Sequence, residues 1–183
     1  NTVIRTQGGD GSNYGIFMTL AHGVIMEGND IAGNSLGFWI QSSRNVVVRN
    51  NVFNASGGGI GLGNSGPGGS DGALIVNNTI SSPGSGISLL RSRAASVLNN
   101  TMYQVGAIGS IGIDVTLEAN DSVFIRNAVI GSNSSVIGVR FLGGLNNTFN
   151  HTVLNVSGGT GIQQFGGNER VTATLGRNWR DVH

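Results

Sequence analysis

The sequence predicts an all-β solenoid of about seven coils, in which short parallel strands stack from one coil to the next. Three observations support this prediction. A Gly-apolar-x-apolar unit recurs along the chain, and an Asn-x-apolar unit recurs beside it. No segment shows the 3.6-residue apolar period of a helix over three turns. Composition agrees, because the 183 residues include 32 glycines and 22 asparagines but only 2 prolines.

The glycine unit sets the length of each coil. Successive units lie 22, 22, 27, 26, 26 and 23 residues apart. Their first glycines are Gly15, Gly37, Gly59, Gly86, Gly112, Gly138 and Gly161. We expect insertions between units at 64–70, 103–110 and 117–121. They must bulge outward as loops, because the stacked strands fix the interior.

Each coil also holds two further short apolar runs. One follows an asparagine, as in Asn51-Val52-Phe53, and the other precedes that asparagine, as in Val46-Val47-Val48. A strand of three to five residues cannot bury its apolar face alone, whereas stacking gives it a neighbour in the next coil. We therefore expect three short strands per coil around an interior of Ile, Val, Leu, Phe and Met.

This repeat resembles that of a known family. The segment 44–62, RNVVVRNNVFNASGGGIGL, and its copy 73–89, ALIVNNTISSPGSGISL, are similar to the right-handed parallel β-helix repeat of pectin-lyase-like and NosD-like proteins. That group includes pectate lyases, polygalacturonases, mannuronan epimerases and phage tailspikes. The resemblance implies a right-handed, single-stranded parallel β-helix over residues 1–170. Residues 171–183 would form an incomplete final coil or a C-terminal tail.

The resemblance also assigns a structural role to the repeated asparagines. In this family, asparagine side chains at one strand corner stack from coil to coil, since an amide both donates and accepts hydrogen bonds. The matching residues are Asn51, Asn78, Asn100 and Asn127. In the following coil we expect His151 to take the place of the asparagine.

A row of outward residues is the candidate functional face. In enzymes of this fold the active groove follows the outer face of the sheet made by the glycine units. Alternation places the residue between the two apolar positions of each unit on that face. The predicted row is Phe17, Trp39, Gly61, Ser88, Asp114, Arg140 and Gln163. Gly61 leaves a gap between an aromatic end and a polar end.

The aromatic end of the row is expected to bind sugar rings. Phe17 and Trp39 would form an exposed platform, and Ser88 and Gln163 would add polar contacts to a ligand. The alternative is that a segment preceding Asn1 covers the two rings.

The polar end of the row allows two interpretations. Asp114 and Arg140 would be neighbours about 4.8 Å apart, the spacing of adjacent strands. They form either a catalytic pair acting on an acidic polysaccharide or a cross-strand surface ion pair. The cluster of Asp114, Glu118 and Asp121 is the candidate for a calcium site, and no other metal or cofactor is expected.

Composition limits the classes of function. A net charge of +1 argues against a nucleic-acid binder. The chain has no cysteine, so it has no disulfide or thiolate metal site, and no apolar run long enough to span a membrane. Eight Asn-x-Ser/Thr sequons fit an extracellular protein. They begin at Asn54, Asn77, Asn99, Asn120, Asn133, Asn146, Asn150 and Asn155.

The leading functional hypothesis is an extracellular or cell-surface segment, with a periplasmic location as the alternative. It would be mainly architectural and would present its outer row to polysaccharide or to a neighbouring protein. A second hypothesis is a lyase or epimerase module using Asp114 and Arg140, although the Asn-Thr-Asp, Asp-Asp and Gly-His-Gly patterns of polygalacturonases are missing. A third is a subunit of a stacked fibre, joined through open ends of the solenoid.

Overall fold

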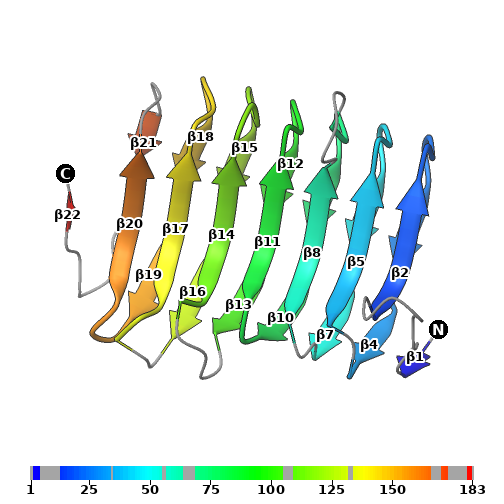
Figure 1. The fold of residues 1–183 in the computed structure, drawn as a ribbon, viewed down its shortest axis with the longest axis horizontal. Coiled ribbons are helices and arrows are strands. Elements are labelled where there is room, and N and C mark those ends of the chain that lie inside the picture. The colour runs from blue at the N-terminus through cyan, green and yellow to red at the C-terminus, as the bar shows by residue number, and fades with distance from the viewer. Residues whose placement is uncertain are drawn as a thin grey trace.

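The computed structural model is a right-handed solenoid of three parallel sheets (Figure 1). In each coil the chain passes from sheet 1 to sheet 2 to sheet 3, and every strand pairs with the equivalent strand of the next coil. The structure describes residues 2–4, 13–33, 35–54, 57–63, 69–104, 109–131, 134–165, 170–172 and 181–182.

Along each sheet the strands follow one another in the order of the chain. Sheet 1 contains β1 (Thr2–Ile4), β4 (Asp30–Ala32), β7 (Val52–Asn54), β10 (Thr79–Ser82), β13 (Thr101–Gln104), β16 (Ala128–Gly131) and β19 (Val153–Val156). Sheet 2 contains β2 (Tyr14–Thr19), β5 (Leu36–Gln41), β8 (Gly58–Gly63), β11 (Ser85–Leu90), β14 (Ile111–Thr116), β17 (Ile137–Leu142), β20 (Thr160–Phe165) and β22 (Asp181–Val182). Sheet 3 contains β3 (Ile25–Glu27), β6 (Val47–Arg49), β9 (Leu74–Val76), β12 (Ser96–Leu98), β15 (Val123–Ile125), β18 (Thr148–Asn150) and β21 (Arg170–Thr172).

The predicted fold class is confirmed, and the coil count differs slightly. Each of the seven glycine units forms one strand of sheet 2, from β2 to β20, and these seven strands enclose six complete turns. Beyond residue 170, β21 pairs with β18 and β22 pairs with β20. Residues 173–180 and 183 lie outside the described residues, so the boundary at residue 170 stays a prediction.

The interior is a single apolar column. Ile60, Ile87 and Ile113 follow one another on successive strands of sheet 2 and are at most 1% exposed. Near the C-terminal end, the rings of Phe124 and Phe149 stack with their centroids 4.2 Å apart. Each coil thus buries its apolar side chains against apolar side chains one coil away. In this way strands of only three to six residues share one hydrophobic core.

The repeated glycine marks the corner where sheet 1 meets sheet 2. A Cβ placed on the glycine of one coil would lie 2.5 to 2.7 Å from the carbonyl oxygen of the equivalent glycine in the next coil. Non-bonded carbon and oxygen atoms do not approach each other so closely, so no residue larger than glycine fits at this position. This holds for Gly37, Gly59, Gly86, Gly112 and Gly138. Backbone stacking at this corner is therefore the physical reason for the glycine period.

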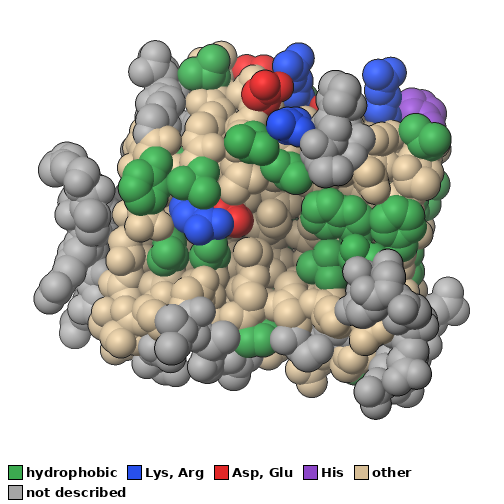
Figure 2. Space-filling view, viewed as in Figure 1, with side chains coloured by type: hydrophobic (Ala, Val, Ile, Leu, Met, Phe, Trp, Pro, Cys, Tyr) green, Lys and Arg blue, Asp and Glu red, His purple; other side chains and the backbone are tan. Residues whose placement is uncertain are grey.

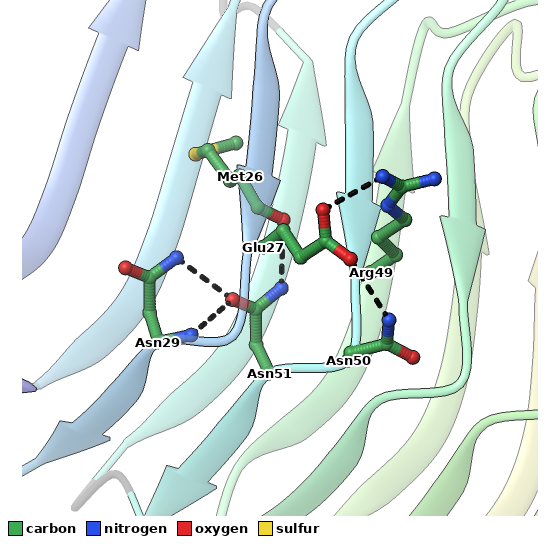
Figure 3. Close-up of polar contacts among 6 residues, drawn as sticks. All are labelled: Met26, Glu27, Asn29, Arg49, Asn50 and Asn51. Atoms are coloured by element: carbon green, nitrogen blue, oxygen red, sulfur yellow. Dashed lines mark hydrogen bonds and ion pairs between the residues drawn. The ribbon is translucent and has the colours of Figure 1, made fainter. Parts of the chain in front are cut away.

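The predicted asparagine ladder is confirmed at the corner between sheets 3 and 1. Each side-chain amide donates to the side-chain oxygen of the next asparagine, at 2.8 to 3.1 Å. The same oxygen accepts a second bond from the preceding asparagine's backbone N–H, at 2.9 to 3.0 Å. The ladder runs from Asn29 through Asn51, Asn78, Asn100 and Asn127, and Figure 3 shows its first step.

The expectation for His151 is wrong by one residue. His151 has a φ of 50° and lies exposed, as does Asn50 with a φ of 55°. Both residues occupy the left-handed turn position just before the ladder position. Thr152 is the residue stacked after Asn127; it is 1% exposed, and its hydroxyl has no hydrogen-bond partner. The ladder ends at Asn127 because a threonine side chain is too short to continue it.

A second polar stack, which the sequence did not lead us to expect, lies at the corner between sheets 2 and 3. The Oγ of Ser70 accepts a bond from the backbone N–H of Ser43 at 3.3 Å, and the Oγ of Ser92 accepts one from Ser70 at 3.1 Å. These serines are spaced by 27 and 22 residues, as are Asn51, Asn78 and Asn100. The shared spacing is the signal that could have revealed them.

Candidate binding face on sheet 2

Strand register confirms the positions of the outward row. Phe17 pairs with Trp39, Trp39 with Gly61, and Gly61 with Ser88. The series continues from Ser88 to Asp114, Arg140 and Gln163. All seven residues therefore lie side by side along sheet 2, one per coil, on the face turned toward the viewer in Figure 2.

The aromatic end is an exposed apolar platform. Phe17 is 51% exposed, and its ring centroid lies 5.5 Å from that of Tyr14. Trp39 and Leu36 lie on the next strand and are partly exposed. Figure 2 shows a broad hydrophobic area over this end of the sheet.

The gap at Gly61 is filled by Trp39. A Cβ on Gly61 would lie 2.3 Å from Cε3 and 2.5 Å from Cζ3 of that indole, and a Cβ on Gly58 would lie 2.6 Å from Cδ1 of Leu36. The side chains of β5 therefore lie down over the bare backbone of β8. The sequence indicated a break in the row at Gly61, whereas the structure extends the apolar platform across three strands.

At the polar end, Asp114 and Arg140 form a two-point ion pair. Nε of Arg140 donates to Oδ1 of Asp114 at 2.9 Å, and Nη2 donates to Oδ2 at 2.7 Å. The side chain of Asp114 is 9% exposed and that of Arg140 is 28% exposed. Planar guanidinium and carboxylate groups fit together in this geometry, which is the strong form of such a pair.

The pair lies among apolar side chains. Ile111 and Ile137 precede it on the two strands, and Leu142 and Phe165 follow it on β17 and β20. Figure 2 shows one adjacent basic and acidic pair toward the left of this face, with hydrophobic side chains above and below it. Each charge neutralises the other, and both carboxylate oxygens are engaged. The geometry matches the ion-pair interpretation, and the catalytic role of Asp114 and Arg140 stays a prediction.

A shallow groove lies beyond the C-terminal ends of β11, β14 and β17. It has a volume of about 470 Å³ and is lined in part by Leu117, Leu145 and the Gly143 backbone. A smaller hollow of about 210 Å³ shares two of its lining residues. The charged residues of this hollow are Asp71, Arg91, Arg93 and Glu118. Two cations and two anions cancel, so the groove extends the face without adding net charge.

The structure gives no support to the calcium hypothesis. Asp114 is engaged by Arg140, and Glu118 and Asp121 lie exposed after the strand. Among the described residues, no group of three or more His, Cys, Asp or Glu side chains is placed to hold a metal ion. The calcium site therefore stays a prediction. In the part of the chain that the structure describes, no helix is long and apolar enough to cross a membrane.

One solved structure shares this architecture. The chain is similar to the Streptococcus pneumoniae surface protein and adhesin PfbA, with a TM-score of 0.66 and 14% sequence identity. The match covers 90% of this chain and 61% of the adhesin structure, so this chain spans about three-fifths of that length. At this identity the likeness shows the fold alone.

Three further comparisons concern a second solved structure, curated proteins and a family model. Trypsin-treated QnrB1, a plasmid-mediated fluoroquinolone resistance protein, shares 13% identity over 79% of this chain and 73% of its own, but its TM-score of 0.23 carries no argument. A comparison with curated proteins gave no match. The family model described as right handed beta helix region matches residues 1–102, which is more than half of the sequence. The chain therefore belongs to the right-handed β-helix family.

Proposed function

We propose that this chain is an architectural β-helix that binds polysaccharide on the outer face of sheet 2. The observation that carries the proposal is the aromatic platform, in which Phe17 is 51% exposed and Trp39 lies over the bare backbone at Gly61. Exposed aromatic area of this kind is costly in water and usually marks a contact site. The flat apolar faces of sugar rings fit such a surface, because aromatic rings offer a large apolar contact area.

The charge of the face favours a neutral glycan over an acidic one. The Asp114–Arg140 pair is internally neutralised, and the groove and the hollow beyond it each carry equal numbers of acidic and basic residues. An acidic polymer would need unpaired cationic side chains, which hold a carboxylate through charge-assisted hydrogen bonds. We expect hydroxyl groups of the ligand to bond with Ser88 and Gln163, the two uncharged polar residues of the row.

An extracellular or cell-surface location follows as part of this proposal. A glycan-binding face would meet polysaccharide outside the cell. Seven of the eight sequon asparagines lie in the described part of the chain, and Asn54, Asn77, Asn99, Asn146 and Asn155 are exposed there. Asn120 and Asn150 are half-buried, and Asn133 lies outside the described residues.

Glycan binding can be tested by titration. Neutral and acidic oligosaccharides would be added to the protein while indole fluorescence and heat of binding are recorded, in a Trp179→Phe background that leaves Trp39 as the only indole. Loss of one stacking contact of about 1 to 1.5 kcal/mol corresponds to roughly tenfold weaker binding. We expect that loss for Trp39→Ala and for Phe17→Ala. Tyr103→Ala is the matched control, because Tyr103 is 43% exposed but lies on sheet 1.

Two outcomes would count against the proposal. One is the absence of binding across the whole panel, and the other is binding that both platform variants leave unchanged. The acidic polymers in the panel also test the lyase hypothesis. Unsaturated uronate products that disappear in Asp114→Ala or Arg140→Ala would make this face catalytic, and their absence from every uronate polymer would remove that hypothesis.

A further inference from the structure

The outer face of sheet 3 is covered by aliphatic side chains. In the strands of this sheet from β3 to β18 the middle residue points inward, and the first and third residues point outward. The outward positions of β9 and β15 are all aliphatic, and the neighbouring strands add further apolar residues. Together these outward residues define the aliphatic face: Ile25, Val47, Leu74, Val76, Leu98, Val123 and Ile125.

This face is large enough to be a contact surface but small for a permanent one. Five strands at about 4.8 Å spacing and two outward residues per strand cover on the order of 300 Å². Apolar patches of about 300 to 600 Å² on a monomer are often functional. Stable complexes bury about 800 Å² per partner, so a contact here would be weak and dependent on concentration.

The two edges of the face are built alike. In each of the six described coils from β3 to β18, a residue with positive φ stands shortly before the sheet 3 strand, and another follows it directly. The residues before the strands are Gly23, Asn45, Gly72, Ala94, Asp121 and Asn146. The residues after the strands are Gly28, Asn50, Asn77, Asn99, Arg126 and His151. The coil of β15 is the one with opposite charges at its two edges, Asp121 and Arg126, and both are exposed.

We propose that this face pairs two copies of the chain about a two-fold axis parallel to the solenoid axis. Such an axis places each strand opposite the same strand of the second copy, with its direction reversed. Leu74 then meets Val76 of the second copy, and Val123 meets Ile125. At the edges of β15, Asp121 faces Arg126 of the second copy, and the symmetry forms this ion pair twice.

The charges select this axis over the other face-to-face arrangement. A two-fold axis along the strands would reverse the order of the coils and, over the five strands of the face, set β15 opposite β3. Asp121 would then face Gly23 and Arg126 would face Gly28, so neither charge would find a partner at the edges. Near the N-terminal end, Arg49 is already paired with Glu27 at 2.7 Å. Its aliphatic stem lies beside Val47 and adds to the contact.

Pairing through sheet 3 leaves both sheet 2 faces uncovered. A dimer would therefore present two copies of the candidate binding face on opposite sides. Two linked sites can bind a polymer more tightly than either site alone. This consequence rests on the proposed function, whereas the dimer itself does not.

The dimer can be tested by charge reversal. The molar mass would be measured by sedimentation from about 1 µM to about 1 mM, the range of weak complexes. We expect the wild-type mass to rise toward that of a dimer. The single variants Asp121→Arg and Arg126→Asp each place like charges opposite one another, so each should weaken association at least tenfold. The double variant restores the ion pairs with their charges exchanged. It should associate within about threefold of wild type. Leu98→Glu, on β12 beside the central strand of the face, should abolish association.

The charge variants also separate dimerisation from folding. Asp121 and Arg126 are exposed, and circular dichroism with thermal unfolding would show that each variant keeps the fold. A wild-type chain that stays monomeric to about 1 mM would overturn the proposal. So would single charge reversals or a Leu98→Glu variant that associate like wild type. Glycan titration of the same variants at low concentration shows whether glycan binding fails independently of dimerisation.

Discussion

The asparagine corner and the outward row of sheet 2 are built on the same stacked coils but follow opposite rules. At the corner, the same side chain occupies five consecutive coils and bonds to copies of itself. In the outward row, seven successive strands carry seven different residues, and contacts between neighbouring strands join unlike groups. Trp39 covers Gly61, and Arg140 binds Asp114.

The difference follows from the surroundings of the two regions. A ladder amide is buried, so each of its polar atoms needs a partner, and the next coil can supply one only from an equivalent position. Most outward side chains reach water, which can satisfy a polar group and leaves the residue type less constrained. Repetition in this chain therefore marks positions under structural constraint, and variation marks the surface where a specific function can be placed.

The largest effect is expected from breaking the ladder in the middle. Asn78→Ala removes the oxygen that accepts two bonds from Asn51 and the amide that donates to Val48 and Asn100. Each buried group left without a partner costs about 1 to 3 kcal/mol. We expect a loss of about 3 to 5 kcal/mol in the free energy of unfolding, measured by denaturant titration.

Two variants control for the effect at Asn78. Asn77→Gly changes the adjacent asparagine, which is exposed with a φ of 55°, and should shift stability by less than about 0.5 kcal/mol. Asn29→Ala removes the first member of the ladder and should cost less than Asn78→Ala, because Asn29 only donates within the ladder. Equal losses at Asn29 and Asn78 would contradict a ladder in which each amide serves two neighbours.

A smaller effect is expected from the ion pair of the outward row. Exposed pairs contribute about 0 to 1 kcal/mol, and breaking a buried pair costs about 3 to 5 kcal/mol. Asp114 is nearly buried and Arg140 is partly exposed, so we expect about 1 to 3 kcal/mol for Asp114→Asn. A double-mutant cycle with Asp114→Ala and Arg140→Ala should give a coupling of about 1 to 2 kcal/mol. A coupling near zero would show that the two charges act independently, contrary to the ion-pair interpretation.

The same contrast explains how much the sequence could predict. The glycine period and the asparagine ladder were visible because stacking allows one residue type at those positions. The outward row was also placed correctly, since alternation along short strands leaves few choices. The contact of Trp39 with Gly61 was not visible, because it depends on a side-chain conformation. The aliphatic face of sheet 3 was hidden for another reason: outward Leu74 and inward Ile75 look alike in the sequence, and both read as core.

The smallest effect is expected at Glu27, where an exposed pair interrupts the pattern of sheet 3. The hydrogen bond from Arg49 lowers the pKa of the Glu27 carboxyl below its usual value; slight desolvation opposes this shift, and a bond from Asn50 adds to it (Figure 3). A carboxyl with a lower pKa in the folded state stabilises the fold above its unfolded pKa, and this contribution is lost as the pH falls through the folded pKa. We therefore expect Glu27→Gln to be slightly less stable than wild type at neutral pH and equal to it in acid.

Parallel unfolding curves across that pH range provide the measurement, with Glu118→Gln as the control for removing an exposed carboxylate. A difference between wild type and Glu27→Gln that persists unchanged into acid would show that the pair contributes through packing of its side chains and not through charge.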